Sequence, residues 1–238
     1  MAKLSVDQTL LKAKSHAKRG EVEEAHKLYH NVLQAFPKNG RAQKGLGDLI
    51  KTKTPATTQN PPQELLHELL AHFQNGRYGD AEKLAAPITQ EFPEHQFAWK
   101  VLGVVLGATG RKSQAEQAMQ KAVALSPQDA NTHNNLGVIL QELGRLDEAE
   151  ASFLQAIALK PALAEGHNNL GVALKELSRL DEALASHNQA IALKPDYAEA
   201  HNNLGVTLAD LGRLDEALAS YNQAIALKPD YAEAHNNL

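Results

Sequence analysis

Residues 198–231 read AEAHNNLGVTLADLGRLDEALASYNQAIALKPDY, and this stretch decides the fold. Each half places apolar or small residues three and four apart, which is the spacing of one helical face. A glycine between the halves predicts the end of one helix, the aspartate after it opens the next, and a proline ends the second. The stretch therefore predicts two antiparallel helices. Their apolar faces consist of His201, Leu204, Gly205 and Leu208, then Ala217, Tyr221, Ala224 and Ile225.

The same pattern recurs every thirty-four residues. One helix pair cannot cover its own apolar face, so successive pairs are expected to stack into a solenoid. The clearest units end at regularly spaced prolines, two earlier units at 6–39 and 62–95 are more divergent, and 232–238 is a partial copy. The regular units are 96–129, 130–163, 164–197 and 198–231, with prolines at Pro127, Pro161, Pro195 and Pro229.

The amino-terminal part departs from this period. Residues 41–50 resemble the first half of a unit whose second half is missing. The stretch KTKTPATTQNP at 51–61 follows it, and its proline and threonine content predicts a linker. We therefore expect an amino-terminal part at 1–50, a linker at 51–61 and a repeat array at 62–238.

The residues of the repeat carry a family resemblance. Their spacing resembles the tetratricopeptide repeat, although Leu69 and Ile88 stand where that repeat has small residues. The resemblance implies an all-α, right-handed superhelical solenoid whose concave wall is built by first helices and binds other proteins. It is carried by Trp99, Leu102, Gly103, Ala115, Ala122 and Pro127, repeated as Leu136, Gly137, Ala149, Phe153, Ala156 and Pro161.

Composition narrows the function classes. The 238 residues contain no cysteine, which excludes disulfides and thiolate sites. Residues 1–53 carry a net charge of +6 within an overall −4, but their lysines alternate with apolar helix positions and lack interleaved aromatics, so we expect no nucleic-acid partner. The sequence contains neither a secretion signal nor an apolar run long enough to span a bilayer, which predicts a cytoplasmic protein without membrane insertion.

A stripe of amides and acids is expected to face the groove. We number the positions of each thirty-four-residue unit from its first residue. If positions 4, 7, 8 and 11 point into the stack, positions 2, 6, 9 and 13 lie on the opposite side of the first helix. A carboxamide can donate to and accept from a peptide group, so a row of them could hold an extended chain by its backbone. The stripe reads Asn131, Asn135, Val138, Glu142; Glu165, Asn169, Val172, Glu176; Glu199, Asn203, Val206, Asp210; and Glu233, Asn237.

This stripe is similar to the asparagine ladder of O-linked N-acetylglucosamine transferases and their bacterial Spindly-like relatives. The resemblance implies that Asn135, Asn169, Asn203 and Asn237 contact a protein or peptide ligand. The alternative is that these amides bond only to neighbouring first helices or to water. Because the chain stops seven residues into a further repeat, we expect either the recognition arm of a larger protein, such as a transferase, or a scaffold that self-associates through that end.

Two further features refine the predicted groove. In the unit 96–129 the stripe is Phe97, Val101, Val104 and Ala108, an apolar patch that could anchor a ligand side chain unless the linker or the helix near 41–50 covers it. The stripe carboxylates could favour a ligand with lysine or arginine, or could form only a solvated face.

Histidines offer no catalytic or metal site. His133, His167, His201 and His235 occur once per first helix, where Trp99 stands in an earlier unit, so we interpret them as packing residues. His187 occupies the core position of Phe153 and Tyr221. We therefore expect no enzyme activity, no cofactor and no metal.

Overall fold

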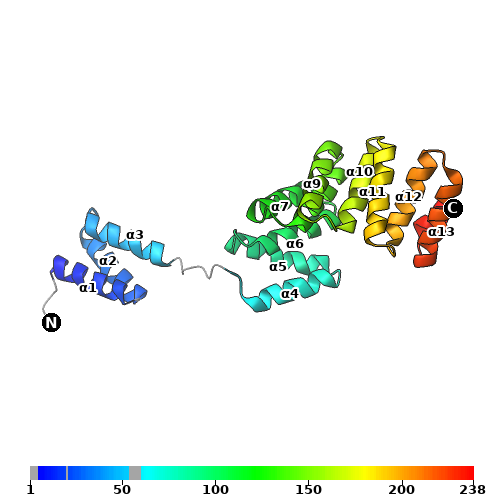
Figure 1. Cartoon of the computed structure of the whole chain (residues 1–238). Coiled ribbons are helices and arrows are strands. Elements are labelled where there is room, and N and C mark those ends of the chain that lie inside the picture. The colour runs from blue at the N-terminus through cyan, green and yellow to red at the C-terminus, as the bar shows by residue number, and fades with distance from the viewer. Residues whose placement is uncertain (1–4, 20, 54–59) are drawn as a thin grey trace. The chain divides into compact units, whose positions relative to one another are not determined.

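The computed structural model describes residues 5–19, 21–53 and 60–238, and over these residues every regular element is a helix (Figure 1). The chain divides into two units, Met1–Asn60 and Pro61–Leu238, and each is described by itself. The helices are α1 (Val6–Lys18), α2 (Val22–Ala35), α3 (Gly40–Lys53), α4 (Gln63–Gln74), α5 (Tyr78–Glu91), α6 (Gln96–Ala108), α7 (Lys112–Leu125), α8 (Ala130–Glu142), α9 (Leu146–Leu159), α10 (Ala164–Glu176), α11 (Leu180–Leu193), α12 (Ala198–Asp210), α13 (Leu214–Leu227) and α14 (Ala232–Asn237).

The first unit is a helix pair followed by one more helix. Ser5 caps α1 with a reciprocal capping box, in which its side chain accepts from the backbone of Gln8 while the Gln8 side chain accepts from the backbone of Ser5. Leu10 and Tyr29 are buried between the helices. The third helix continues through Lys53, three residues into the predicted linker, and residues 54–59 of that linker lie outside the described part of the chain.

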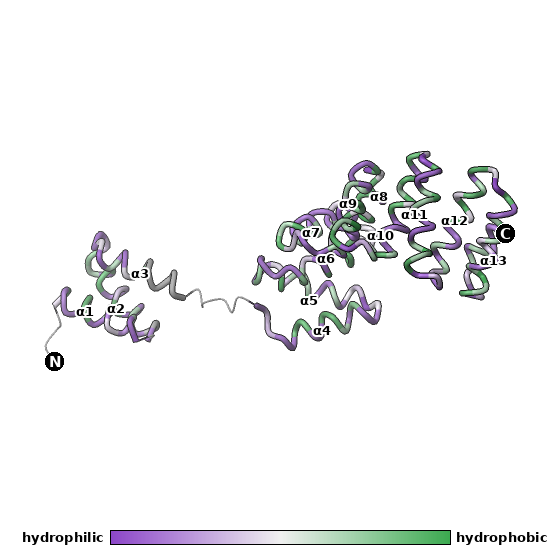
Figure 2. The backbone as a smooth tube through the Cα atoms, in the orientation of Figure 1, coloured by the Kyte–Doolittle hydropathy of each residue, from purple (hydrophilic) through white to green (hydrophobic). Residues whose placement is uncertain are grey.

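The second unit stacks five helix pairs, α4–α5 to α12–α13, followed by α14. Each helix has an apolar face toward the stack and a polar one away from it, so hydrophobic and hydrophilic colours alternate along the tube in Figure 2. The backbones of first helices contact those of the first helices in the next repeat, whereas within this unit the backbones of successive second helices lie farther apart. The first helices therefore lie on the inner side of the curve and build its concave wall.

In the pairs from α6–α7 to α12–α13, a glycine in the first helix allows its partner helix to pack closely, whereas α4 has Leu69 at this position. The ring of Phe153 lies against the backbone at Gly137, where an added Cβ would be 2.5 Å from the Phe153 Cε1 atom. Tyr221 lies against Gly205 in the same way. The large side chain of the second helix thus fills the space that the glycine leaves open.

The turns inside the pairs depend on a left-handed backbone residue. Gly110, Gly144 and Gly212 have φ values of 80°, 75° and 74° at this position. Glycine adopts this conformation without strain, because it has no Cβ. Ser178 takes the same conformation with φ 61°.

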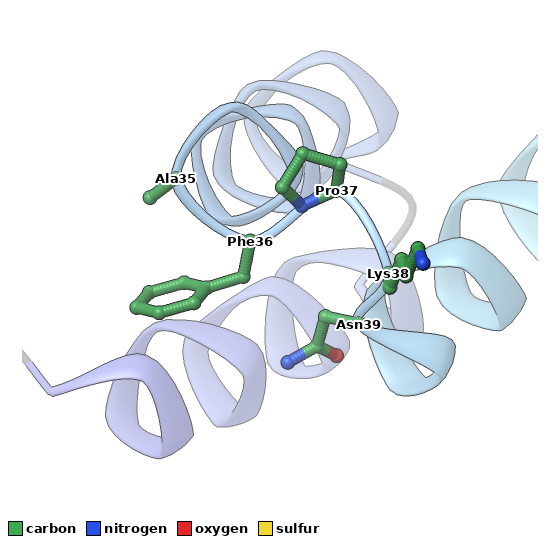
Figure 3. A pocket seen from close by; sticks show the side chains of 5 residues that line it. All are labelled: Ala35, Phe36, Pro37, Lys38 and Asn39. Carbon is green, nitrogen blue, oxygen red and sulfur yellow. The ribbon is translucent and has the colours of Figure 1, made fainter.

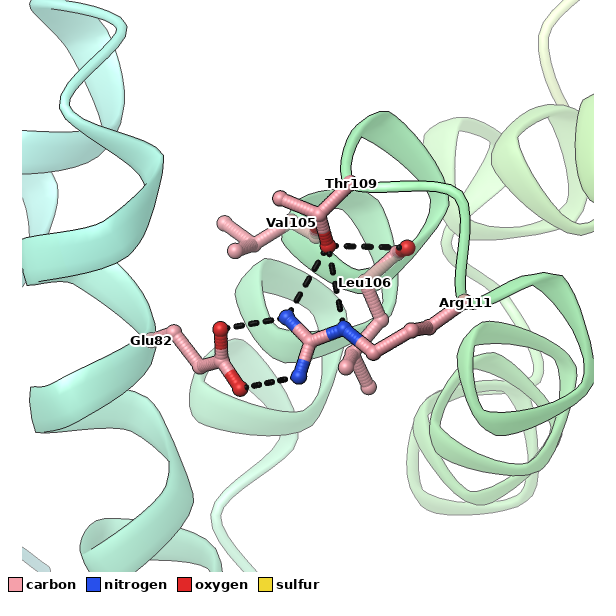
Figure 4. A network of polar contacts seen from close by, with 5 residues as sticks. All are labelled: Glu82, Val105, Leu106, Thr109 and Arg111. Carbon is pink, nitrogen blue, oxygen red and sulfur yellow. Dashed lines mark hydrogen bonds and ion pairs between the residues drawn. The ribbon is translucent and has the colours of Figure 1, made fainter.

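Arginine–glutamate pairs connect successive second helices at their edges. In Figure 4 the Arg111 guanidinium lies between the Glu82 carboxylate and the Thr109 hydroxyl, and its Nη1 atom donates to Glu82 Oε1 at 2.6 Å. Arg179 bonds Glu150 at 2.7 Å in the equivalent place. In the next repeat the acceptor position is Leu184, and among the residues that the structure describes Arg213 forms an ion pair only with Glu216 of α13. Such exposed pairs contribute little stability each.

The close approach at Gly137 predicts opposite effects for two glycine substitutions. Gly137→Ala should lower the free energy of unfolding by about 1 to 3 kcal/mol, because the new methyl group overlaps the Phe153 ring. Gly107→Ala should raise it by about 0.5 to 1 kcal/mol, because a Cβ there meets only Ile139 Cγ1 at 3.8 Å and Ala115 Cβ at 3.9 Å, and alanine favours the helix. Urea titration of both variants checks this pair, and equal effects would contradict it.

Candidate peptide-binding groove

From α10 onward, the second asparagine of each pair reaches the first asparagine of the preceding repeat. Its Nδ2 atom donates a hydrogen bond to that neighbour's Oδ1 atom, so the amides form a chain of contacts along the concave wall. One hydrogen of each donating amide is used in this way, while its own oxygen accepts no bond from the described residues. The bonds are Asn169 to Asn134 (3.1 Å), Asn203 to Asn168 (3.2 Å) and Asn237 to Asn202 (3.0 Å).

These contacts hold the amides in one orientation. The acceptors Asn168 and Asn202 are buried, and Asn168 also donates to Glu199 Oε1 at 3.4 Å. The donors Asn169 and Asn203 are half-buried on the inner wall. The bonding to neighbouring first helices that the sequence left as an alternative is thus present, and it leaves one N–H and the oxygen of each donor available.

Asn135 differs from the other members of the row. Its neighbour in the preceding repeat is Lys100, which offers no acceptor. The carboxamide of Asn135 therefore has no hydrogen-bond partner among the described residues, and both of its N–H groups are available.

Lys100 instead belongs to a polar network around Asp129. The Asp129 carboxylate accepts from Lys100 Nζ at 2.9 Å, from Gln96 Nε2 at 2.9 Å and from the Thr132 hydroxyl at 2.7 Å, and it caps α8 by accepting from the Asn131 backbone. Burial raises the pKa of Asp129, but these donors together outweigh that effect and lower the pKa to about 2.

The stripe carboxylates fall into two groups. Three near the ends of the first helices already have partners: Gln141 Nε2 donates to Glu176 at 2.6 Å, Lys175 lies 3.9 Å from Asp210, and Lys112 lies 3.7 Å from Glu142. The other three, Glu165, Glu199 and Glu233, lie exposed in the first turns of their helices, and of these Glu199 accepts the hydrogen bond from Asn168.

Two tyrosines lie beside the first-turn carboxylates. Burial and then the Glu199 charge raise the pKa of both Tyr197 and Tyr231. Lys194 lies 4.7 Å from the centre of the Tyr197 ring, and Lys228 lies 4.8 Å from that of Tyr231. Carboxylates, rings and ammonium groups thus lie close together at the starts of α12 and α14, and the helical pattern of the sequence does not predict this because the two tyrosines lie in the loops before these helices.

The apolar patch is only partly at the surface. Val101 is 1% exposed and belongs to the core, so its prediction as an exposed anchor is wrong. It occupies the repeat position of Asn169, which lies between adjacent first helices, and an apolar side chain there packs into the core. Phe97 and Val104 are half-buried against the same core, and Ala108 is exposed. The later stripe valines, Val138, Val172 and Val206, are half-buried as well.

The repeated histidines hold the loops between repeats. His133 Nε2 lies 3.0 Å from the Pro127 carbonyl oxygen, and the bond recurs in each later repeat. A carbonyl only accepts, so the imidazole Nε2 carries the proton. Trp99 Nε1 donates to the Pro93 carbonyl at 2.8 Å in the same way. Within the described residues no group of three or more histidines or acids is arranged to hold a metal ion.

The first unit contains a separate open hollow. It is lined by Ala35, Phe36, Pro37, Lys38 and Asn39, and the Phe36 ring is 52% exposed (Figure 3).

No described helix is both long and apolar enough to cross a membrane.

Comparison with known families identifies the repeat. The description "Tetratricopeptide repeat" matches residues 10–50 and 68–130, and a second version of it matches 118–151. The description "TPR repeat" matches residues 139–178, 173–212 and 207–238. The chain belongs to the tetratricopeptide repeat family.

Solved structures share the solenoid. TTC0263, a thermophilic TPR protein of Thermus thermophilus, is 27% identical, with a TM-score of 0.63 over 73% of this chain and 95% of that one. YrrB, described as a TPR protein with an unusual peptide-binding site, is 21% identical, with a TM-score of 0.58 over 78% and 95%. MamA is also 21% identical, with a TM-score of 0.59 over 68% and 95%. No curated protein matches the chain.

The Asp129 network predicts an acid-sensitive contribution to stability. The pKa of Asp129 in the folded chain lies below its ordinary value, so its contribution is complete above about pH 4 and is lost as the pH falls toward 2. Lys100→Met should lower the free energy of unfolding by about 1 to 2 kcal/mol at pH 7, and by less at pH 2.5. Urea titrations at both pH values measure this difference.

Lys121→Met provides the matched control. Lys121 pairs with Glu94 at 3.2 Å, but the Glu94 side chain is 74% exposed, so its removal should have little effect at either pH. A Lys100→Met effect that is equally large at pH 7 and pH 2.5 would assign the loss to packing instead of to the ion pair.

Proposed function

We propose that this chain is a non-catalytic scaffold that binds extended peptide segments along its concave wall. The observation that carries the proposal is the row of amides on adjacent first helices, in which Asn169, Asn203 and Asn237 are each fixed by a bond to the preceding repeat. A fixed amide loses little freedom when a ligand binds, so more of the hydrogen-bond energy contributes to affinity.

The chemistry of the row favours recognition of the backbone. Each of Asn169 and Asn203 offers one acceptor and one donor, and Asn135 offers one acceptor and two donors. These groups match the N–H and C=O groups of an extended peptide without reading its side chains. The same fold carries a peptide-binding site in YrrB.

Any preference for particular side chains of the ligand should come from the residues at the edge of the concave wall. Glu165 and Glu199 lie in the first turns of their helices and form no ion pair with a described residue, so we expect ligands whose lysine or arginine residues lie near the starts of α10 and α12. Phe97 and Val104 provide a half-buried apolar surface on α6 for one larger side chain. A few neutral hydrogen bonds of about 0.5 to 1.5 kcal/mol each imply broad recognition of micromolar or weaker affinity.

Alanine substitution of the available amides tests the proposal. The triple variant Asn135→Ala, Asn169→Ala, Asn203→Ala should weaken binding of peptides selected from a random unstructured library by about 10-fold or more, because three backbone contacts are lost. Affinities can be measured by fluorescence anisotropy, with folding checked by circular dichroism.

A double variant on the outer helices provides the control. Asn188→Ala, Asn222→Ala removes exposed amides of α11 and α13 and should leave affinity unchanged. Equal binding by all three proteins would show that the amide row is structural only.

A second candidate function is self-association. Leu214, Leu218 and Leu238 are 67%, 45% and 58% exposed at the carboxy-terminal end of the described array, whereas the equivalent Leu184 is half-buried against the next repeat. An apolar surface of this kind could stack on another copy. A role as the recruiting region of a transferase stays a prediction from the sequence.

Sedimentation velocity tests self-association. If the leucine surface mediates it, the sedimentation coefficient should rise with concentration from micromolar to hundreds of micromolar, and Leu218→Lys should abolish the rise because burying an unpaired ammonium is unfavourable. A wild-type chain that stays monomeric over this range excludes the second function.

A further inference from the structure

The repeat of α10 and α11 contains a core histidine where the others have apolar or phenolic groups. His187 is fully buried, and neither Nδ1 nor Nε2 of its ring has a hydrogen-bond partner. The ring lies against the α10 backbone, since a Cβ added at Gly171 would be 2.5 Å from His187 Cε1. Phe153 and Tyr221 occupy this place in the neighbouring repeats. An imidazole without partners loses its hydration on folding and gains no bond in exchange.

The same repeat contains a second unfavourable feature. Its turn places Ser178 in the left-handed region with φ 61°, where the repeats on either side have Gly144 and Gly212. A residue with a Cβ is strained in that region. Both features therefore weaken the one helix pair, and they do so independently.

Charged groups around the imidazole do not stabilise its protonated form. The helices that pack against α11 are α10 and α12. The titratable groups of α10 are Glu165, His167, Lys175 and Glu176, and those of α12 are Glu199, His201 and Asp210. Burial first, and then the Lys175 charge, lower the pKa of His187 to about 4. Lys175 itself lies 3.9 Å from Asp210.

We propose that residues 164–197 form a pH-sensitive opening site of the array, at which His187 takes up a proton when α10 and α11 separate. A solenoid permits this, because each repeat contacts only its neighbours and can open without unfolding the whole chain. The proton favours the open form: the closed form excludes it until about pH 4, whereas an exposed imidazole binds it near pH 6.5. Opening is therefore favoured progressively as the pH falls below 6.5.

Opening here would divide the amide row. The α10 helix supplies Asn169, which bonds Asn134 of α8, and Asn168, which accepts from Asn203 of α12. Separation of α10 would break both contacts and interrupt the concave wall at its middle. The inference concerns the array itself and does not depend on the proposed peptide ligand.

Hydrogen exchange measured by mass spectrometry tests the proposal on the whole chain without ligand. Protection factors of amides in 164–197, corrected for intrinsic exchange at each pH, should fall about 20-fold between pH 7 and pH 5. Those in 96–129 should fall much less. Equal loss in all repeats would overturn the proposal.

Two variants separate the contributions. His187→Tyr makes residues 182–204 identical to 216–238, and should remove the excess pH dependence of 164–197. Ser178→Gly should raise protection in this repeat about 5-fold at both pH values and leave the pH dependence unchanged. A pH dependence that persists in His187→Tyr would contradict the role of the imidazole.

Nuclear magnetic resonance of the wild-type imidazole provides a readout that needs no variant. The ring carbon shifts of His187 in the folded chain should remain those of the neutral form down to pH 5. A titration midpoint near 6.5 in the folded protein would show that the ring is accessible to protons without opening, and would overturn the proposal.

Discussion

The close approach of the two helices in each pair is the constraint on which the remaining structure depends. In the pairs from α6–α7 to α12–α13, a glycine in the first helix accepts a large side chain from the second, as Gly137 accepts Phe153. This contact fixes the spacing of each pair and therefore the spacing of first helices along the inner wall. The amide contacts follow from it, because Asn169 reaches Asn134 only when adjacent first helices are held at a constant distance. The even spacing of the amides along the concave wall thus depends on the regular packing of the helix pairs that carry them.

The thirty-four-residue period and the spacing of apolar residues predict the fold and the buried face of each helix, because both are local properties of the sequence that repeat at a fixed spacing. The unit 198–231 alone predicts two helices and their apolar stripes, and the structure has α12 and α13 there. The histidine–proline bonds were not predicted, although the spacing of six residues between Pro127 and His133 recurs in every later unit. Such a bond depends on how the loop folds back, which a helical period does not describe.

The groove was harder to predict than the fold because its chemistry depends on neighbours one repeat away. The sequence selected Asn135, Asn169 and Asn203 as equivalent, but Lys100 in the preceding repeat removes the acceptor that the other two use. Val101 was expected at the surface by the same angular argument, yet an apolar side chain at that position is buried. The position of a residue on a helix determines the direction in which its side chain points. The exposure of that side chain also depends on its neighbours in the adjacent repeats.

Near-identity of the repeats makes the differences between them informative. Residues 182–204 and 216–238 differ only at His187 and Tyr221, so one side chain distinguishes these two stretches of sequence. The tyrosine hydroxyl lies at the end of a long ring, while both imidazole nitrogens lie inside the core without partners. In a globular core the effect of such a group would spread through many contacts. In a solenoid it stays within one helix pair, because each repeat packs only against its neighbours. Stability can therefore vary along the array while the groove keeps a constant geometry.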